Sequence, residues 1–352
     1  MFEAILAFFI VLAVLVLAHE FGHFISAKKY GVRVEEFGFG FPPRLFSFRK
    51  GETLYSFNLF PLGGFVRILG ENGEDSDDPG NFASRSAFQK AVMLSAGVFF
   101  NLVLAAVIFA FVLWLGLPVD ADDPLLQGKI ENTAVTVIGV VKDSAAERAG
   151  IKLGDKMLGF NEIGQVQELI KKNVGKTTVF EIERGSERII LPASLPSSEI
   201  EEGVVFGIAM ARLGIVREPW YKAPLGGVRL TAFAFWGTIK GLWRILGLLF
   251  SGNSVLGMVS GPVGIFSIVS TTLDFGAVFL LSLVAVLSVN LAVMNMLPLP
   301  ALDGGRLLFL AIEKVRGRPI PQRTGGLAHA LGFAILILLM AVITYYDVKT
   351  GF

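Results

Sequence analysis

Cysteine is absent from this 352-residue sequence, which excludes both a disulfide framework and a thiolate metal site. Any zinc must therefore be bound by histidine and carboxylate side chains, and the chain has three histidines. Charged residues are also scarce: they make up 17% of the chain, and the net charge is +1. No basic cluster stands apart from the apolar segments, so nothing indicates binding to nucleic acid. The N-terminus lacks the basic start of a secretory signal, and we expect a retained first span.

Apolar residues are what the sequence has in excess. They make up 53% of the chain, the mean hydropathy is +0.64, and 31 residues are phenylalanine. Segments long and apolar enough to span a bilayer occur at residues 4–27, 91–117, 276–302 and 326–346. The sequence therefore predicts a polytopic α-helical membrane protein with four transmembrane helices.

Lysine and arginine concentrate in two connections, the one between the first and second spans and the one between the third and fourth. By the positive-inside rule, both connections face the cytoplasm. The termini and a soluble insert from about residue 119 to residue 217 then lie outside. We divide the chain at these points into residues 1–118, 119–217, 218–275 and 276–352.

Residues 225–250 form a rival fifth span. Lys222, Arg229, Lys240 and Arg244 fall within about 60° of one another around a helix, which makes one basic face on an otherwise apolar segment. This pattern favours an amphipathic helix that lies in the membrane plane. The alternative is a tilted span whose basic side chains extend to the membrane surface.

The connection at residues 32–69 is not helical in pattern. Glycines and prolines divide it into short segments, and residues 53–59 alternate between the two faces of a strand. We expect β-hairpins that are rich in phenylalanine and associated with the membrane. Their open edges must be covered by protein or line a cavity, and such an edge can bind an extended peptide by strand addition. A purely structural sheet at the membrane surface is the alternative.

The insert at residues 119–217 alternates strands and helices. Strands are predicted at 135–141, 156–160, 177–184 and 188–193, and helices at 144–149 and 166–173. Residues 144–155, followed by Met157-Leu158, resemble the most recognisable segment of PDZ domains. The resemblance implies one extracytoplasmic PDZ-like α/β domain, which either captures a peptide terminus or acts as a gate over a site in the membrane, and its ligand stays open.

The first span contains the sequence H-E-x-x-H, formed by His19, Glu20 and His23. Two histidines four residues apart lie about 40° from each other around a helix, so both imidazoles can reach one metal ion. The glutamate is then placed to take a proton from water. Placing an ionisable side chain at this depth in the membrane costs on the order of 3 kcal/mol, and such residues generally have a function. The stretch therefore predicts a metal-dependent hydrolase rather than an incidental polar cluster.

A catalytic zinc site of this kind needs a third protein ligand. Asp303 is the candidate, because it follows a segment at residues 295–302 in which Pro298 and Pro300 break the third span. With four spans, Asp303 comes to the same depth as His19 and His23. An aspartate that only caps the next helix is the alternative. The remaining histidine, His329, is interpreted as a polar cap at the start of the fourth span.

With these motifs, the chain resembles the site-2 proteases, which are intramembrane zinc metalloproteases, and within them the bacterial RseP and RasP group. Other matching stretches are Gly38-Phe39-Gly40, residues 260–265, and the run from Asn295 to Gly304. The resemblance implies zinc bound by His19, His23 and Asp303, and Glu20 as the catalytic base. It also implies a substrate-binding role for Asn295 and for the β-loop that contains Gly38, Phe39 and Gly40.

Substrates implied by the resemblance are single-pass membrane proteins such as anti-sigma factors, and signal-peptide remnants, cleaved at the bacterial cytoplasmic membrane with the active site toward the cytoplasm. The family often has Ala-Gly-Pro in the second span and an asparagine three residues on, whereas here Ala96-Gly97 is followed by Val98 and Asn101. The competing hypothesis from another functional class is a membrane scaffold with a PDZ module and a structural zinc. A metalloprotease that acts on soluble substrates is an alternative closer to the main hypothesis.

Overall fold

The structure is a computed structural model that describes residues 1–71, 78–122, 130–141, 143–185, 187–195, 206–318 and 320–350. The chain forms two compact units. The first comprises Met1–Ala110, Pro224–Thr271 and Leu281–Phe352, and the second comprises Phe111–Ala223 and Thr272–Leu280. Several long helices begin in one unit and end in the other.

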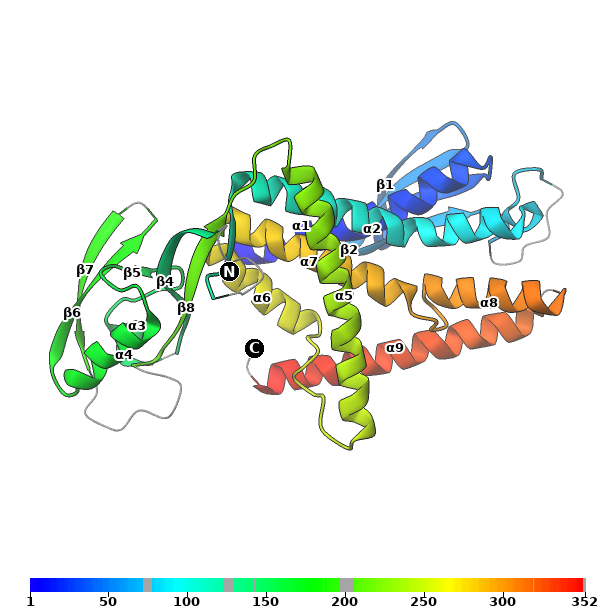
Figure 1. The fold of residues 1–352 in the computed structure, drawn as a ribbon. Helices are drawn as coiled ribbons and strands as arrows, with labels where there is room; N and C mark the ends of the chain where they lie inside the picture. The colour runs from blue at the N-terminus through cyan, green and yellow to red at the C-terminus, as the bar shows by residue number, and fades with distance from the viewer. Residues whose placement is uncertain are drawn as a thin grey trace. The chain divides into compact units, whose positions relative to one another are not determined.

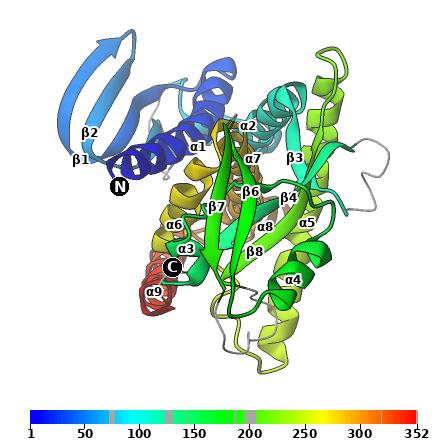
Figure 2. The same cartoon turned by 90° about the vertical axis from the view of Figure 1, so that its left-hand side faces the viewer.

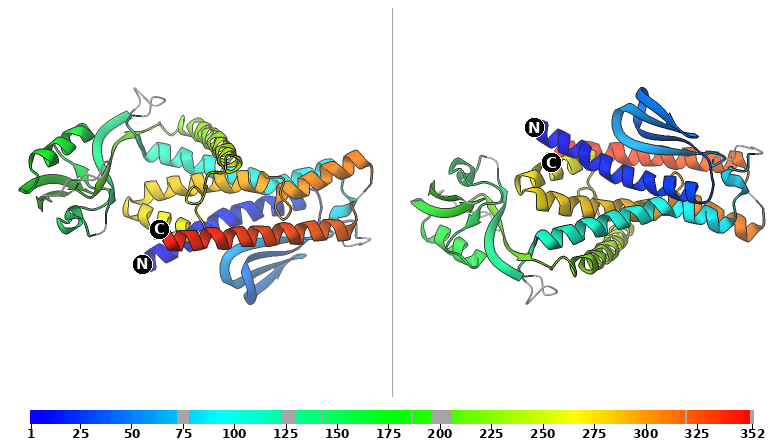
Figure 3. Two further views of the ribbon diagram at one scale, coloured as in Figure 1. Left: turned by 90° about the horizontal axis from the view of Figure 1, so that it is seen from below. Right: turned by 90° about the horizontal axis from the view of Figure 1, so that it is seen from above.

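Seven helices of the described residues, most of them long and apolar, contribute to the first unit (Figure 1). They are α1 (Phe2–Lys29), α2 (Ala87–Leu115), α5 (Ala223–Phe250), α6 (Pro262–Asp274), α7 (Ala277–Met296), α8 (Asp303–Arg316) and α9 (Gln322–Thr350). Within this unit, α1, α2, α7 and α9 run alongside one another, as the views from below and above show (Figure 3). These helices coincide with the four segments that the sequence predicts as spans, so the helical prediction is confirmed.

Among the described residues, α1, α2, α5, α7 and α9 are long and apolar enough to cross a membrane. In α1, α2 and α7 at most a third of the most apolar 18-residue window is buried inside the protein, and in α5 and α9 none of it is. Apolar side chains that the protein itself does not cover need an apolar solvent, which the bilayer supplies. The chain therefore has the architecture of a polytopic membrane protein.

Helix α5 differs in direction from the other long helices. It crosses the bundle instead of running along it, and it is viewed nearly along its own axis in Figure 3. Gly227 lets α5 approach α2 closely, because a Cβ there would overlap the carbonyl of Ala106. Thr238 donates a hydrogen bond of 2.7 Å to Asn290 of α7. Helix α5 thus packs across α2 and α7 within this unit.

The connection between α1 and α2 forms the predicted sheet, from β1 (Val34–Lys50) and β2 (Thr53–Ile68). Both strands fold back, so that Phe37 is paired with Tyr55 on one side and with Val66 on the other. Residues 64–68 have a strand partner on one side alone among the described strands, and they form an edge. Figure 2 shows the sheet beside α1. A buried cluster anchors its base to α1 and α2: Ala27, Val32, Val34, Ile68, Phe82, Met93 and Leu94.

The second unit is a six-stranded antiparallel sheet with two short helices. Its strands are β3 (Leu117–Asp120), β4 (Ile130–Val140), β5 (Lys156–Met157), β6 (Thr177–Arg184), β7 (Glu187–Ser194) and β8 (Ile208–Val216), and its helices are α3 (Ala145–Arg148) and α4 (Ile163–Lys172). The strand order is β3-β8-β4-β5-β6-β7. The six predicted elements between residues 135 and 193 are present, while β3 and β8 were not predicted. This unit is therefore an α/β domain built on one antiparallel sheet.

Candidate metal centre

One turn of α1 places both histidines against α2. His19 and His23 are 8% and 9% exposed, so they are shielded from solvent, although most of α1 is not covered by other parts of the protein. Two glycines allow this approach of the helices, because a Cβ on Gly22 would overlap the carbonyl of Ala96 and a Cβ on Gly97 would overlap the imidazoles of His19 and His23. The sequence therefore folds here into a tight helix pair with the two imidazoles at its contact.

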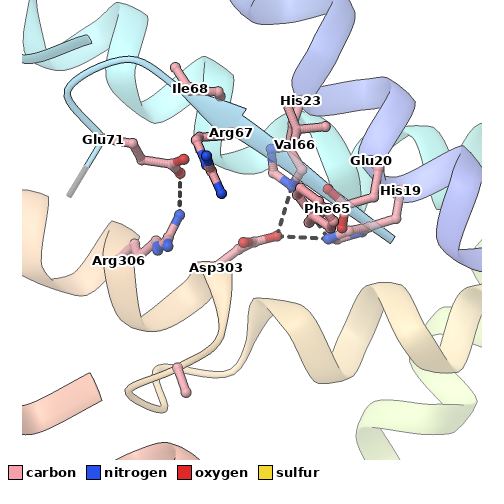
Figure 4. Close-up of a pocket in the computed structure, with 11 residues that line it drawn as sticks. His19, Glu20, His23, Phe65, Val66, Arg67, Ile68, Glu71, Asp303 and Arg306 are labelled. Atoms are coloured by element: carbon pink, nitrogen blue, oxygen red, sulfur yellow. Dashed lines mark hydrogen bonds and ion pairs between the residues drawn. The ribbon is translucent and has the colours of Figure 1, made fainter. Parts of the chain in front are cut away.

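Asp303 reaches the histidines from the start of α8. Between α7 and α8 the chain turns sharply, and Ala301 adopts a left-handed backbone with φ of 83°. The amide of Ala301 donates a hydrogen bond of 2.9 Å to Nδ1 of His329 in α9. Gly304 and Gly305 lie so close to the carbonyls of residues 296–299 that no side chain fits there. The turn is thus held on both sides, and it directs the Asp303 carboxylate toward α1 (Figure 4).

The three side chains bring their donor atoms together. Oδ2 of Asp303 lies 3.1 Å from Nε2 of His19 and 3.2 Å from Nε2 of His23, and the two Nε2 atoms are 3.3 Å apart. Tetrahedral zinc with bonds of 2.0–2.1 Å requires donors separated by about 3.3 Å. The three atoms therefore fit a zinc ion, and they form the one such group of potential ligands among the described residues.

Each imidazole has a partner at its other nitrogen. Nδ1 of His23 lies 2.9 Å from the carbonyl oxygen of Met93, which can only accept, so Nδ1 carries the hydrogen and Nε2 is left as a lone pair for a metal. Nδ1 of His19 lies 3.3 Å from the side-chain amide of Asn101 in α2. The outer partners of both ligands thus come from the same helix.

Two cavities adjoin this group of side chains, both of them lined by His19 and Asp303. One, of about 310 Å³, is lined by His19, Glu20, His23, Phe65, Val66, Arg67, Ile68, Glu71, Ala301, Asp303 and Arg306. The other, of about 280 Å³, is lined by Val16, His19, Glu20, Gly63, Gly64, Leu291, Asn295, Ala301, Leu302 and Asp303. Glu20 lines both cavities, so its carboxylate is beside the ligands and accessible to a molecule in either. An open space next to three donors is typical of a catalytic zinc site, whereas structural sites are closed by four ligands.

An ion pair forms part of the wall of the larger cavity. Glu71, which follows β2, contacts Arg306 one turn after Asp303 in α8 (Figure 4). Burial raises the pKa of the Glu71 carboxyl, and the neighbouring guanidinium of Arg306 opposes that shift without cancelling it. The pair joins the end of the sheet to the helix that carries Asp303.

The structure brings His19, Glu20, His23 and Asp303 together as the sequence predicts, and it places Asn295 at the smaller cavity. Gly38 and Phe39 are paired on both sides in the middle segment of the sheet, with Gly40 next to them in β1, and none of the three is among the residues that line the two cavities. The edge at residues 64–68 occupies the position next to the ligands instead. The substrate-binding role of the three residues stays a prediction.

Sequence reasoning missed several residues at this centre. His329 lies seven residues inside α9 and accepts from Ala301, so its interpretation as a cap at the start of the span was wrong. Gly97 and Asn101 were noted without a role. A signal was available for Asn101, because an amide in the middle of an apolar helix is costly unless it has a polar partner.

Comparison with known proteins agrees with this chemistry. The model of peptidase family M50 matches residues 7–339. The chain is 31% identical to the zinc metalloprotease RasP of Geobacillus kaustophilus, over 99% of each chain. It is 35% identical to a putative zinc metalloprotease of a Nostoc species, over 96% of this chain and 95% of the other, and 28% identical to the regulator of sigma-W protease RasP of Bacillus subtilis, over 99% of each.

Proposed function

Because the chain belongs to peptidase family M50 and is an intramembrane zinc metalloprotease, we propose that it cleaves the transmembrane segments of single-pass membrane proteins of the anti-sigma-factor type. The observation that supports this proposal most strongly is the set of three donor atoms, 3.1–3.3 Å apart, with Glu20 beside them in a helix long and apolar enough to span a bilayer. Remnants of signal peptides are a second substrate class of the same chemistry.

The chemistry divides between the metal and Glu20. His19, His23 and Asp303 would hold the zinc, which when bound would supply a Lewis acid for the scissile carbonyl and would lower the pKa of water to roughly 7. Glu20 acts as general base toward the attacking water, and it returns the proton to the leaving amine as the peptide bond breaks. Glu20 needs access to both water and substrate, and its place between the two cavities provides it.

Substrate is held as an extended strand beside the centre. Phe65, Val66 and Arg67 of β2 line the larger cavity, and Gly63 and Gly64 line the smaller. This edge of the sheet has unpaired backbone groups, and an unwound substrate segment can pair with it by strand addition. Asn295 faces the smaller cavity from α7, where its amide can bind the other side of the substrate backbone. A transmembrane helix hides its peptide bonds, so this unwinding precedes cleavage.

We assign the protein to the bacterial cytoplasmic membrane, with the zinc site toward the cytoplasm and the second unit outside as a PDZ-like domain. The concentration of lysine and arginine in the connections between α1 and α2 and between α7 and α9 supports this orientation. The direction of α5 supports four transmembrane helices with α5 in the membrane plane.

Substitution Glu20→Gln tests the proposal. We expect the purified variant to keep its zinc, measured by elemental analysis, while cleavage of a membrane-anchored anti-sigma factor falls at least 100-fold, in line with loss of a general base. Cleavage is followed with a full-length substrate and with one truncated outside the membrane, in detergent and in vesicles.

Each outcome separates the hypotheses. A Glu20→Gln protein with normal turnover contradicts the catalytic assignment and favours a scaffold with a structural zinc. Equal cleavage of both substrates favours a protease of soluble segments. The cavities beside the three ligands argue against the scaffold, since its zinc would need a fourth protein ligand.

A further inference from the structure

Asn101 lies in the middle of α2 with none of its surface exposed. Its side-chain amide is 3.3 Å from Nδ1 of His19, and its Oδ1 has no hydrogen-bond partner within the described part of the chain. A fully buried amide oxygen without a partner costs about 1–3 kcal/mol. The amide of Asn101 therefore needs an explanation that the zinc ligands alone do not give.

Binding of a metal by His19 decides which of its ring nitrogens carries the hydrogen, and therefore which atom of Asn101 must face it. Nε2 of His19 faces Oδ2 of Asp303 and Nε2 of His23, so this nitrogen must offer its lone pair to zinc. Nδ1 must then carry the ring hydrogen and needs an acceptor. Side-chain oxygen and nitrogen of asparagine occupy equivalent positions, and turning the amide by 180° places Oδ1 where it accepts from Nδ1.

We propose that Asn101 is a positioning residue for the zinc centre, whose side-chain oxygen accepts the Nδ1 hydrogen of His19 and holds this ligand in its zinc-binding tautomer and orientation. The carbonyl oxygen of Met93 has the same relation to His23. Metal-binding histidines generally depend on such outer partners. Helix α2 then supplies the outer partner of both imidazoles, two turns apart.

The surroundings fix Asn101 in this role. Gly97, one turn earlier on the same face of α2, leaves room for the two imidazoles. From the other side, Ser288 of α7 donates a hydrogen bond of 2.8 Å to the backbone carbonyl of Asn101. The backbone is thus tied to α7 while the side chain reaches α1, so the position of the amide is set independently of the metal.

Zinc affinity of the purified full-length protein tests the proposal, by competition with a chelator of known affinity. Asn101→Leu keeps the size of the side chain and removes the acceptor, so we expect zinc to bind 10- to 100-fold more weakly. Asn101→Asp keeps an acceptor oxygen and should restore affinity to within about threefold of the unchanged protein. Thr231→Val removes a buried hydrogen bond within α5, to the carbonyl of Gly227, without touching His19 or Asn101, and should leave zinc affinity unchanged.

Replacing zinc with cobalt gives a second readout, because a purely structural role of Asn101 would not alter the spectrum of the bound metal. Asn101→Leu should change the visible absorption spectrum of the bound cobalt, whereas Thr231→Val should not. Unchanged zinc affinity and an unchanged cobalt spectrum in Asn101→Leu would overturn the proposal, and so would an equal loss in Asn101→Asp or Thr231→Val. The inference rests on the zinc centre, but because it is read from metal binding, failure of the proposed substrate class would leave its test unaffected.

Discussion

Glycines at the contact between α1 and α2 decide how closely the second helix approaches the ligands. Gly97 offers the clearest test, because a methyl group there would fall against both His19 and His23. Displacing a catalytic group by about 1 Å can cost roughly 100-fold in rate. We expect Gly97→Ala to lower cleavage by about that factor and to reduce bound zinc.

The control for this substitution is Gly237→Ala in α5, where an added Cβ would have no neighbour within 4 Å. That variant should retain zinc and activity. Normal zinc content in Gly97→Ala, measured by elemental analysis, would show that the helices can separate without harm to the ligands.

A second test at the scale of single residues concerns His329. Its Nδ1 accepts from the amide of Ala301, which belongs to the turn before Asp303. His329→Leu leaves that amide without an acceptor, which costs about 1–3 kcal/mol. The turn can relieve part of this cost by a change of its backbone, and such a change displaces Asp303. We expect roughly tenfold weaker zinc binding, which chelator competition measures, and restoration by His329→Gln. Equal zinc affinity in all three proteins would mean that Gly304 and Gly305 hold the turn by themselves.

At the scale of elements, α6 depends on one buried carboxylate of α9. Oδ2 of Asp347 accepts 2.9 Å hydrogen bonds from the amides of Gly261 and Gly264, at the start of α6, and Asp347 has no exposed surface. A negative charge there also complements the helix dipole. This contact explains the two glycines of the matching stretch at residues 260–265, since a Cβ on either Gly261 or Gly264 would press on the carboxylate.

Removal of this carboxylate should loosen α6 and α9 from each other. We expect Asp347→Ala to lower the free energy of unfolding by roughly 2–3 kcal/mol, the range for hydrogen bonds to a charged group. Thermal unfolding in detergent measures the loss, and Asp347→Asn, which keeps an acceptor, should recover about half. An unchanged melting temperature in Asp347→Ala would contradict a stabilising role.

At the scale of the whole molecule, the second unit has its own core and its own buried ion pair. Asp155 is fully buried, and its two oxygens bind Nε and Nη2 of Arg184 at 2.7 and 2.8 Å. These hydrogen bonds raise the pKa of Arg184, so its guanidinium stays charged throughout the physiological range. Because the proposed zinc ligands, His19, His23 and Asp303, belong to the other unit, damage here should not reach the metal.

Asp155→Ala tests this independence. Removing one member of a buried pair costs about 3 kcal/mol, so hydrogen exchange in β6 should become faster by on the order of 100-fold, while zinc content stays unchanged. Glu183→Gln is the control, because the pair of Glu183 with Lys156 is largely exposed and should contribute less than about 1 kcal/mol. Loss of zinc in Asp155→Ala would show that the two units are coupled.

Local patterns in the sequence were sufficient to predict the long helices, most elements of the second unit, and the meeting of His19, His23 and Asp303. Apolar length determines a membrane helix whatever its partners are, and the i, i+4 spacing places His19 and His23 on one face of it. Asp303 was predicted because an acidic residue after two helix-breaking prolines is costly unless it is bound. Strands β3 and β8 were missed, since their pairing with residues far along the chain leaves little local signal.

The tertiary structure alone decided which groups hold the ligands in place. The contacts His23–Met93, His19–Asn101 and Ala301–His329 join positions 70, 82 and 28 residues apart, and no periodicity encodes them. Likewise, the double pairing of Phe37 put residues 64–68, and not Gly38 to Gly40, at the edge beside the centre. The sequence by itself thus determined the chemistry of the site, because ligand identity is a local property. Its geometry was decided by helix contacts, because these depend on surfaces that meet only after folding.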